Sequence, residues 1–413
     1  MSESGNWRRA TGIAGAAIGV IAAGAAAGVA IERMTVGRGI RRKARLALDA
    51  AGPYGALRGT PGRALADDGT ELYYEVDDVT SGEAAEAEGA IGTTGAAGTT
   101  GPAGSRRRRL FGRKAPAPVT VVFSHGFCLN QDVWHFQRAA LRGLVRTVHW
   151  DQRSHGRSAR GAAQRGPGAV PVTIDQLGRD LKAVIDAAAP DGPLVLVGHS
   201  MGGMTVMALA DQFPELIRDR VVGVAFIGTS SGKLAEVTYG LPTLGVNAVR
   251  SVLPGVLRML GSQAELVERG RRATAEIAAG VIKRYSFSSK DVDPAVARFA
   301  ERLLESTPID VVAEFYPAFT EHDKAKALPA FLEVPALVLA GENDLVTPSS
   351  HSEAIGDLLP DAELVIVPDG GHLVILEHPE VVTDRLADLL VRVGAVPAPS
   401  NVGTHGSTAQ PGA

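Results

Sequence analysis

The stretch LVLVGHSMGGMTVMAL, residues 194–209, decides the fold of this chain. Its first four residues are aliphatic, which is typical of a buried parallel strand, and Met204, Met207 and Ala208 recur at helical spacing. Residues 198–202 must therefore turn sharply between a strand and a helix. A turn this tight needs glycine, and glycine stands at both of its ends.

The turn has the pattern G-x-S-x-G between a strand and a helix, which is typical of a nucleophile elbow. Such an elbow lifts the serine oxygen clear of the sheet edge and directs the N-terminus of the next helix toward it. The pattern also arises by chance in a chain with 49 glycines. Ser200 is therefore a candidate nucleophile whose role depends on partners elsewhere in the chain.

A serine hydroxyl needs a base to take its proton, and the base needs an acid that fixes its tautomer and stabilises its cation. Asp344 follows the predicted strand in VPALVLAGEND, and His372 follows the next one in AELVIVPDGGH. Because carboxyl ends of parallel strands meet at one edge, we predict a triad of Ser200, Asp344 and His372. Glu342 remains a weaker candidate for the acid.

A tetrahedral intermediate also needs two preorganised N–H donors for its oxyanion. The turn SHGFCL should offer the backbone N–H of Phe127, and Met201, directly after the candidate nucleophile, should offer the second. We expect His125 to fix this loop by hydrogen bonding. Cys128 is expected to be a small buried thiol rather than a nucleophile.

The segment HWDQRSHGRS could be mistaken for a metal site, because it brings His149, Asp151 and His155 close together. Strand alternation directs His149 into the sheet, and Asp151 can cap the following loop. No Cys/His spacing elsewhere resembles a zinc module. We therefore expect no metal.

Composition limits the possible partners. The 413 residues carry a net charge of −3 with 21% charged residues, so no basic surface suited to nucleic acid is expected. A single cysteine rules out an intramolecular disulfide. The length fits one large domain with appendages, and the oligomeric state is left open.

Alternating strand-like and helix-like segments predict a mostly parallel sheet with helices on both faces. We place this domain at residues 63–395, opening with a hairpin at Asp68-Gly69 that adds antiparallel edge strands. Residues 78–118, rich in Gly, Ala, Thr and Glu, are predicted to be a disordered insertion. Residues 231–333 are predicted to form a helical cap, and residues 396–413 a disordered tail.

The N-terminal region, residues 1–62, contains 20 consecutive uncharged residues at 12–31, about the length that crosses a bilayer as a helix. Basic residues are more numerous after this run than before it, which predicts a single anchor with the folded domain on the cytoplasmic side. The run is mostly Ala and Gly, so an apolar helix docked on protein and a secretory signal remain alternatives. Without an anchor, we expect a soluble cytoplasmic protein.

The pieces SHGF, DQRSHGRS, GHSMGG, GENDLVTP and GGHL, in this order, resemble the α/β-hydrolase superfamily, and within it the capped esterase, lipase and haloperoxidase-like members. The resemblance covers roughly residues 63–395. It implies an α/β fold with an eight-stranded, mostly parallel sheet flanked by helices, a helical cap and no cofactor. The early insertion and the apolar N-terminus depart from the family pattern, although the N-terminus is similar to leaders of actinobacterial members. The resemblance also implies the roles given above for Ser200, Asp344, His372, Phe127 and Met201.

The sequence therefore predicts a serine hydrolase that cleaves carboxylic esters of a fairly hydrophobic small molecule through an acyl-enzyme. Hydrolysis of thioesters, lactones, peracids or carbon–carbon bonds remains open. A non-catalytic, membrane-tethered scaffold is a rival of a different class. Such proteins usually lose one triad position, and none is lost in this sequence.

Overall fold

The computed structural model describes residues 54–80, 118–165, 170–238, 255, 284–289 and 291–396. The predicted anchor at 12–31, most of the predicted insertion at 78–118 and all but the first residue of the predicted tail at 396–413 lie outside the described residues, so these remain predictions. Within the described ranges, no helix combines the length and the apolar character needed to cross a membrane.

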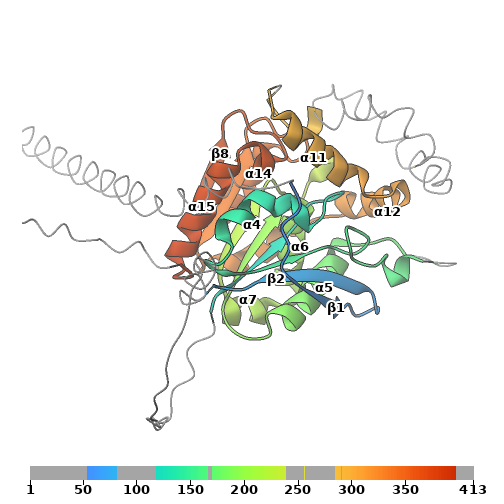
Figure 1. Ribbon diagram of the computed structural model, residues 1–413. Helices are drawn as coiled ribbons and strands as arrows, with labels where there is room; N and C mark the ends of the chain where they lie inside the picture. The colour runs from blue at the N-terminus through green and yellow to red at the C-terminus, as the bar shows by residue number, and fades with distance from the viewer. Residues whose placement is uncertain are drawn as a thin grey trace, which may run out of the picture.

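One sheet organises the described chain (Figure 1), and its strand order is β1-β2-β4-β3-β5-β6-β7-β8. β1 and β2 pair antiparallel, as do β2 and β4, and every other neighbouring pair is parallel. The prediction of an eight-stranded, mostly parallel sheet with an antiparallel edge hairpin is confirmed. The strands are β1 Thr60–Leu65, β2 Glu71–Asp77, β3 Thr120–Ser124, β4 Arg146–Trp150, β5 Leu194–His199, β6 Val221–Ile227, β7 Ala336–Gly341 and β8 Glu363–Val367.

The first strand begins ahead of the domain start that we expected at Arg63. Thr60 and Pro61 already pair with Val76 and Glu75. The two strands of the hairpin are therefore longer than the sequence pattern predicted. Such pairing is set by the partner strand rather than by the local sequence.

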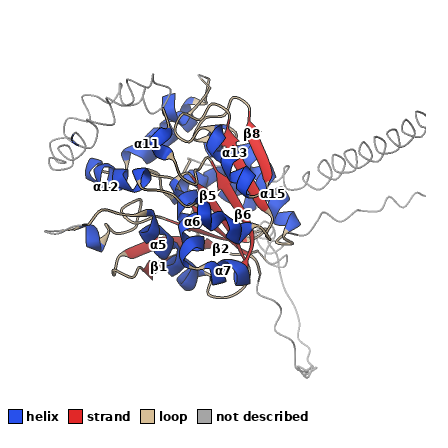
Figure 2. Cartoon of the chain, turned by 180° about the vertical axis from the view of Figure 1, so that it is seen from behind, coloured by secondary structure: helices blue, strands red, loops and turns tan. Residues whose placement is uncertain are grey.

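Helices cover both faces of the sheet (Figure 2). Alternate residues of β5 face opposite ways, as the two-residue period of a strand requires. Leu194 and Leu196 join a core with α5, α6 and α7, whereas Val195 and Val197 join a core with α4, α14 and α15. The helices are α4 His135–Leu141, α5 Ile174–Ala188, α6 Met201–Gln212, α7 Pro214–Arg220, α11 Pro294–Glu305, α12 Ile309–Thr320, α13 Ser349–Leu358, α14 Val374–Glu377 and α15 Pro379–Arg392.

The region predicted as a helical cap contains α11, α12 and the short 3-10 helices Leu234–Glu236 and Ala325–Phe331. α12 packs on the start of α6, where Phe315 joins a cluster of buried side chains with Met201 and Met204. The predicted apolar helix face at 247–261 lies outside the described residues, apart from Gly255. The described part of this region therefore places α12 next to the strand–helix turn that carries Ser200.

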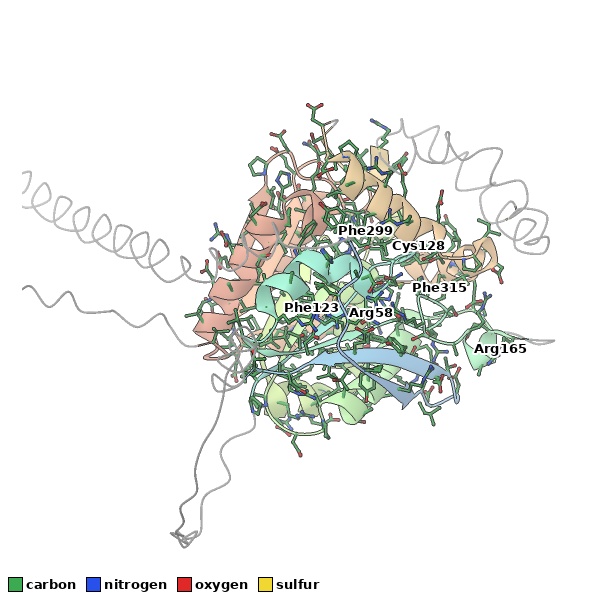
Figure 3. All side chains as sticks on the ribbon, viewed as in Figure 1. Arg58, Phe123, Cys128, Arg165, Phe299 and Phe315 are labelled. Carbon is green, nitrogen blue, oxygen red and sulfur yellow. The ribbon has the colours of Figure 1, made fainter. Side chains whose placement is uncertain are left out.

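Side chains fill the space between the sheet and the helices (Figure 3), and a buried ion network lies among them. Arg153, in the loop after β4, is fully buried, and its guanidinium donates to both carboxylate oxygens of Asp180 at 2.5 and 2.6 Å. It also pairs with Asp68 in the hairpin turn at 2.9 Å. This arginine therefore joins the edge hairpin to α5.

Replacing Asp180 by Ala is expected to lower the free energy of unfolding by about 3 kcal/mol, because Arg153 would keep its charge inside the protein without its main partner. Urea unfolding of the purified protein measures this change. The matched control is Asp186→Ala on the same helix, which removes only an exposed pair with Lys182 and should cost less than about 0.5 kcal/mol. Equal losses in both variants would contradict the role of the buried network.

Candidate active site

The turn between β5 and α6 has the strained geometry of a nucleophile elbow. Ser200 has φ of 52° and ψ of −120°, a conformation that is unfavourable for a residue with a side chain. A Cβ atom on Gly202 would lie 2.1 Å from the carbonyl oxygen of Ser124, and one on Gly198 would lie 2.5 Å from the carbonyl oxygen of Gly202. Glycine at both ends of the turn is therefore a steric requirement.

The structure brings Ser200, His372 and Asp344 together at the carboxyl ends of three strands. His372 Nε2 lies 3.0 Å from Ser200 Oγ, and His372 Nδ1 lies 2.8 Å from Asp344 Oδ2. The imidazole can therefore donate to the carboxylate through Nδ1 and accept the serine proton at Nε2. The three side chains come from loops after β5, β7 and β8, as the sequence predicted.

Asp344 is buried but remains a carboxylate. Burial alone raises its pKa, but the electrostatic interaction with His372 and the hydrogen bonds that the carboxylate accepts outweigh burial and hold the pKa below the usual value. Its Oδ1 accepts the N–H groups of Val346 and Thr347 at 2.7 and 2.9 Å. The weaker candidate for the acid, Glu342, is exposed to solvent.

Thr347 is a part of this site that sequence reasoning missed. Its hydroxyl lies 2.8 Å from the carbonyl oxygen of Gly228, 2.9 Å from Asp344 Oδ2 and 3.3 Å from His372 Nδ1. The hydroxyl thus links the end of β6 to the acid and the base. The sequence does offer a sign of this role, because Thr347 stands three residues after Asp344. At that spacing the Thr347 N–H can reach the carboxylate.

Two other histidines lie near the triad and hold its surroundings. His199 Nε2 donates to the carbonyl oxygen of His372 at 2.9 Å, and burial together with nearby His372 lowers the pKa of His199 to about 3. His125 accepts the N–H of Gln152 at 2.9 Å, and burial lowers its pKa to about 4. Both rings are therefore neutral, and His125 fixes its loop as expected.

The two predicted oxyanion donors belong to the segments after β3 and β5. Met201 is the first residue of α6, and Phe127 lines the same cavity as Ser200. In the part of the chain that the structure describes, neither backbone N–H donates to a protein acceptor. Their role as oxyanion donors stays a prediction.

Cys128 and the residues that could be mistaken for metal ligands have other partners. The Cys128 N–H donates to His155 Nε2 at 3.2 Å. Its side chain lines the cavity at Ser200 and is half-buried rather than buried as expected, and the apolar surroundings raise the pKa of its thiol to about 12. His149 stacks on Phe123 at 4.7 Å, and Asp151 accepts the N–H of Gln131 at 2.7 Å. Among the described residues, no group of His, Cys, Asp or Glu side chains could hold a metal ion.

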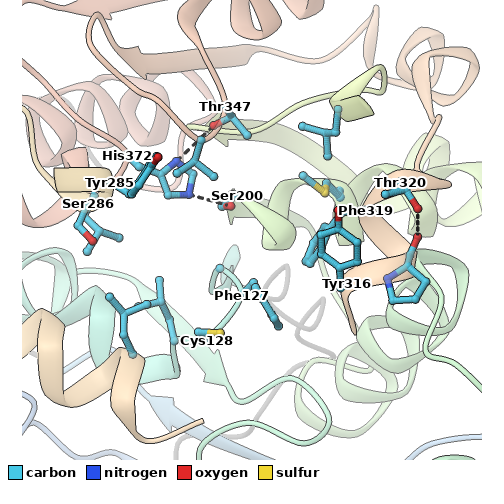
Figure 4. A pocket seen from close by; sticks show the side chains of 18 of the residues that line it. Phe127, Cys128, Ser200, Tyr285, Ser286, Tyr316, Phe319, Thr320, Thr347 and His372 are labelled. Atoms are coloured by element: carbon cyan, nitrogen blue, oxygen red, sulfur yellow. Dashed lines mark hydrogen bonds between the residues drawn. The ribbon is translucent and has the colours of Figure 1, made fainter. Parts of the chain in front are cut away.

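A cavity of about 810 Å³ opens at Ser200 and His372 (Figure 4). Tyr285 lies near His372 on one side, and Tyr316 and Phe319 of α12 lie on the other. Apart from His372, its described lining includes no side chain that is ordinarily charged. The apolar lining residues are Phe127, Leu129, Met204, Leu234, Ala235, Leu304, Pro317, Phe319, Val346 and Leu373.

Known proteins resemble this chain in sequence and in fold. A family model described as alpha/beta hydrolase fold matches residues 119–379, well over half of the chain. The chain belongs to the α/β-hydrolase family. Among curated relatives, this hydrolase is 28% identical over 281 residues to the dihydrolipoyllysine-residue acetyltransferase component of the acetoin cleaving system of Pseudomonas putida. That match covers 68% of this chain but only 65% of the relative.

A second relative of this hydrolase is the sn-1-specific diacylglycerol lipase of Mus musculus, 26% identical over 276 residues, which are 65% of this chain and 80% of the lipase. A solved esterase from Thermogutta terrifontis matches with a TM-score of 0.55 at 22% identity, covering 81% of this chain and 98% of the esterase. The enol-lactonase from Burkholderia xenovorans matches with a TM-score of 0.54 at 23% identity, covering 80% of this chain and 100% of the lactonase. At these identities, the two structures show the shared fold alone.

Proposed function

We propose that this hydrolase cleaves carboxylic ester bonds of small hydrophobic molecules through a covalent acyl-enzyme. The observation that carries the proposal is the hydrogen-bonded chain from Ser200 Oγ through both nitrogens of His372 to Asp344. A serine, a base and an acid in this arrangement are the parts that activate a hydroxyl for acyl transfer.

In the first half-reaction, Ser200 Oγ attacks the ester carbonyl carbon while His372 Nε2 takes the serine proton. Asp344 stabilises the imidazolium, and the N–H groups of Phe127 and Met201 receive the oxyanion. His372 then protonates the leaving alcohol, and the acyl group stays on Ser200. In the second half-reaction, His372 takes a proton from water while the water oxygen attacks the acyl carbon. The bond between the acyl group and Ser200 Oγ then breaks, His372 returns the proton to Ser200 Oγ, and the acid leaves.

The cavity favours neutral, hydrophobic substrates. A carboxylate or ammonium group on the substrate would lose its water shell without a partner of opposite charge among the described lining residues. The mouse relative is named as a diacylglycerol lipase, which is consistent with a neutral acyl substrate. Thioesters and lactones remain alternatives, because the same nucleophile, base and acid act on them.

The test is labelling with a fluorophosphonate probe combined with p-nitrophenyl esters of graded chain length. We expect the probe to label Ser200. We also expect kcat/KM to rise from the acetate to esters with acyl chains of six to eight carbons. The rise should be about tenfold for each 1.4 kcal/mol by which the longer acyl chain binds more tightly. Absence of labelling would support the non-catalytic scaffold. Preference for the acetate would refute the hydrophobic acyl group.

Ester hydrolysis is expected in neutral solution and is expected to be lost in acid, because a general base accepts the serine proton only in its unprotonated form. The pKa of Asp344 lies below its usual value, so the carboxylate is ionised in neutral solution. The pH profile of kcat/KM, recorded with and without EDTA, measures this; loss of activity in EDTA that a divalent metal restores would contradict a metal-free mechanism.

A further inference from the structure

One carboxylate joins the loop of His372 to a segment that lines the cavity. Glu377, the last residue of α14, accepts backbone N–H groups through both oxygens. Its Oε2 accepts from Gly371 at 2.7 Å, and its Oε1 accepts from Ser289 at 2.7 Å and from Ser288 at 3.0 Å. The Ser288 N–H also lies 3.3 Å from Oε2. Gly371 directly precedes His372, so these bonds connect the base to residues 284–289.

The segment 284–289 has further contacts with the loops of the triad. The carbonyl oxygen of Ser286 accepts the N–H of Leu373 at 2.8 Å, and Ser288 Oγ accepts from Asn343 Nδ2 at 2.9 Å. Asn343 directly precedes Asp344. The segment is therefore attached to the loops of both the acid and the base.

The backbone of segment 284–289 lies very close to Gly371. A Cβ atom on this residue would lie 2.6 Å from the nitrogen of Ser288 and 2.7 Å from the carbonyl carbon of Phe287. A larger residue would push the segment away from the loop of His372. Tyr285 and Ser286, in the same segment, line the cavity, so a displacement here would move the cavity wall relative to the imidazole.

We propose that Glu377 is a positioning residue that holds the cavity wall at Tyr285 and Ser286 in a defined place relative to the imidazole of His372. The inference rests on the proposed function in treating His372 as the catalytic base. A carboxylate is required because both of its oxygens accept, whereas a glutamine amide has one acceptor oxygen and an NH₂ group. In Glu377→Gln, the NH₂ group must face either the N–H of Gly371 or the N–H groups of Ser288 and Ser289. The link then loses the hydrogen bond from Gly371, or it loses the one from Ser289 and keeps only the longer one from Ser288.

Hydrogen exchange of the full-length protein tests the link without using activity. In Glu377→Gln, we expect backbone amides of peptides that contain 284–289 or Gly371 to exchange about tenfold faster, because a hydrogen bond to a charged acceptor is lost. The matched control is Glu380→Gln, which removes an exposed carboxylate near the start of α15 and should leave both peptides unchanged. Unchanged protection in Glu377→Gln would overturn the proposal, and this result holds whether or not the protein cleaves esters.

A kinetic comparison separates positioning from a general loss of folded protein. We would measure the ratio of kcat/KM for p-nitrophenyl octanoate to that for the acetate, per site that reacts with a fluorophosphonate. A merely structural role lowers both values equally and leaves the ratio unchanged. We expect the ratio to shift by about fivefold in Glu377→Gln and in Gly371→Ala, with partial recovery in Glu377→Asp, which keeps two acceptor oxygens. An unchanged ratio in both of the first two variants would overturn the proposal.

Discussion

Replacing Ser200 by Ala is expected to reduce ester turnover by a factor of about 10⁴ or more, and His372→Ala by a similar factor. The serine supplies the oxygen that becomes acylated, and the histidine, 3.0 Å away, removes its proton. Because each residue is useless without the other, the double variant should be little worse than either single variant. Steady-state kinetics with a p-nitrophenyl ester measures all three.

The control for this experiment is the stability of the Ser200→Ala variant. Ser200→Ala removes one oxygen from a site that is 7% exposed, so its free energy of unfolding should change by less than about 1 kcal/mol. Losses that add up in the double variant would show that Ser200 and His372 act independently. That result would contradict the assignment of a triad.

Asp344→Asn is expected to lower kcat by a factor of about 10³ to 10⁴. The carboxylate accepts the Nδ1–H of His372 at 2.8 Å, whereas an asparagine amide can donate to Nδ1 and place the ring proton on Nε2. A ring protonated at Nε2 cannot accept the proton of Ser200. The same ester assay measures the loss.

The matched control is Glu342→Gln, two residues earlier in the same loop. Glu342 is exposed, whereas Asp344 is 3% exposed and receives N–H groups from Val346 and Thr347. Glu342→Gln should therefore leave turnover nearly unchanged. If it were the more damaging change, the acid of the site would be Glu342.

The sequence by itself determined the type of fold and the candidate triad. The alternation of apolar strands and helical faces is local, so it predicted the mostly parallel sheet that the structure confirms. The glycines at 198 and 202 indicated the turn, because a strained backbone restricts which residues can occupy it. Once parallel strands were assigned, their carboxyl ends had to meet, which placed Asp344 and His372 near Ser200.

Only the tertiary structure decided which hydrogen bonds hold the triad residues in place, and how large and how apolar the cavity is. Thr347 reaches Gly228 across 119 positions of the chain, and the Glu377 carboxylate reaches Ser288 across 89. The volume and apolar lining of the cavity likewise depend on α12 packing over α6. Contacts at such separations follow from strand register and helix packing, which are set by the whole core rather than by the local pattern of residues.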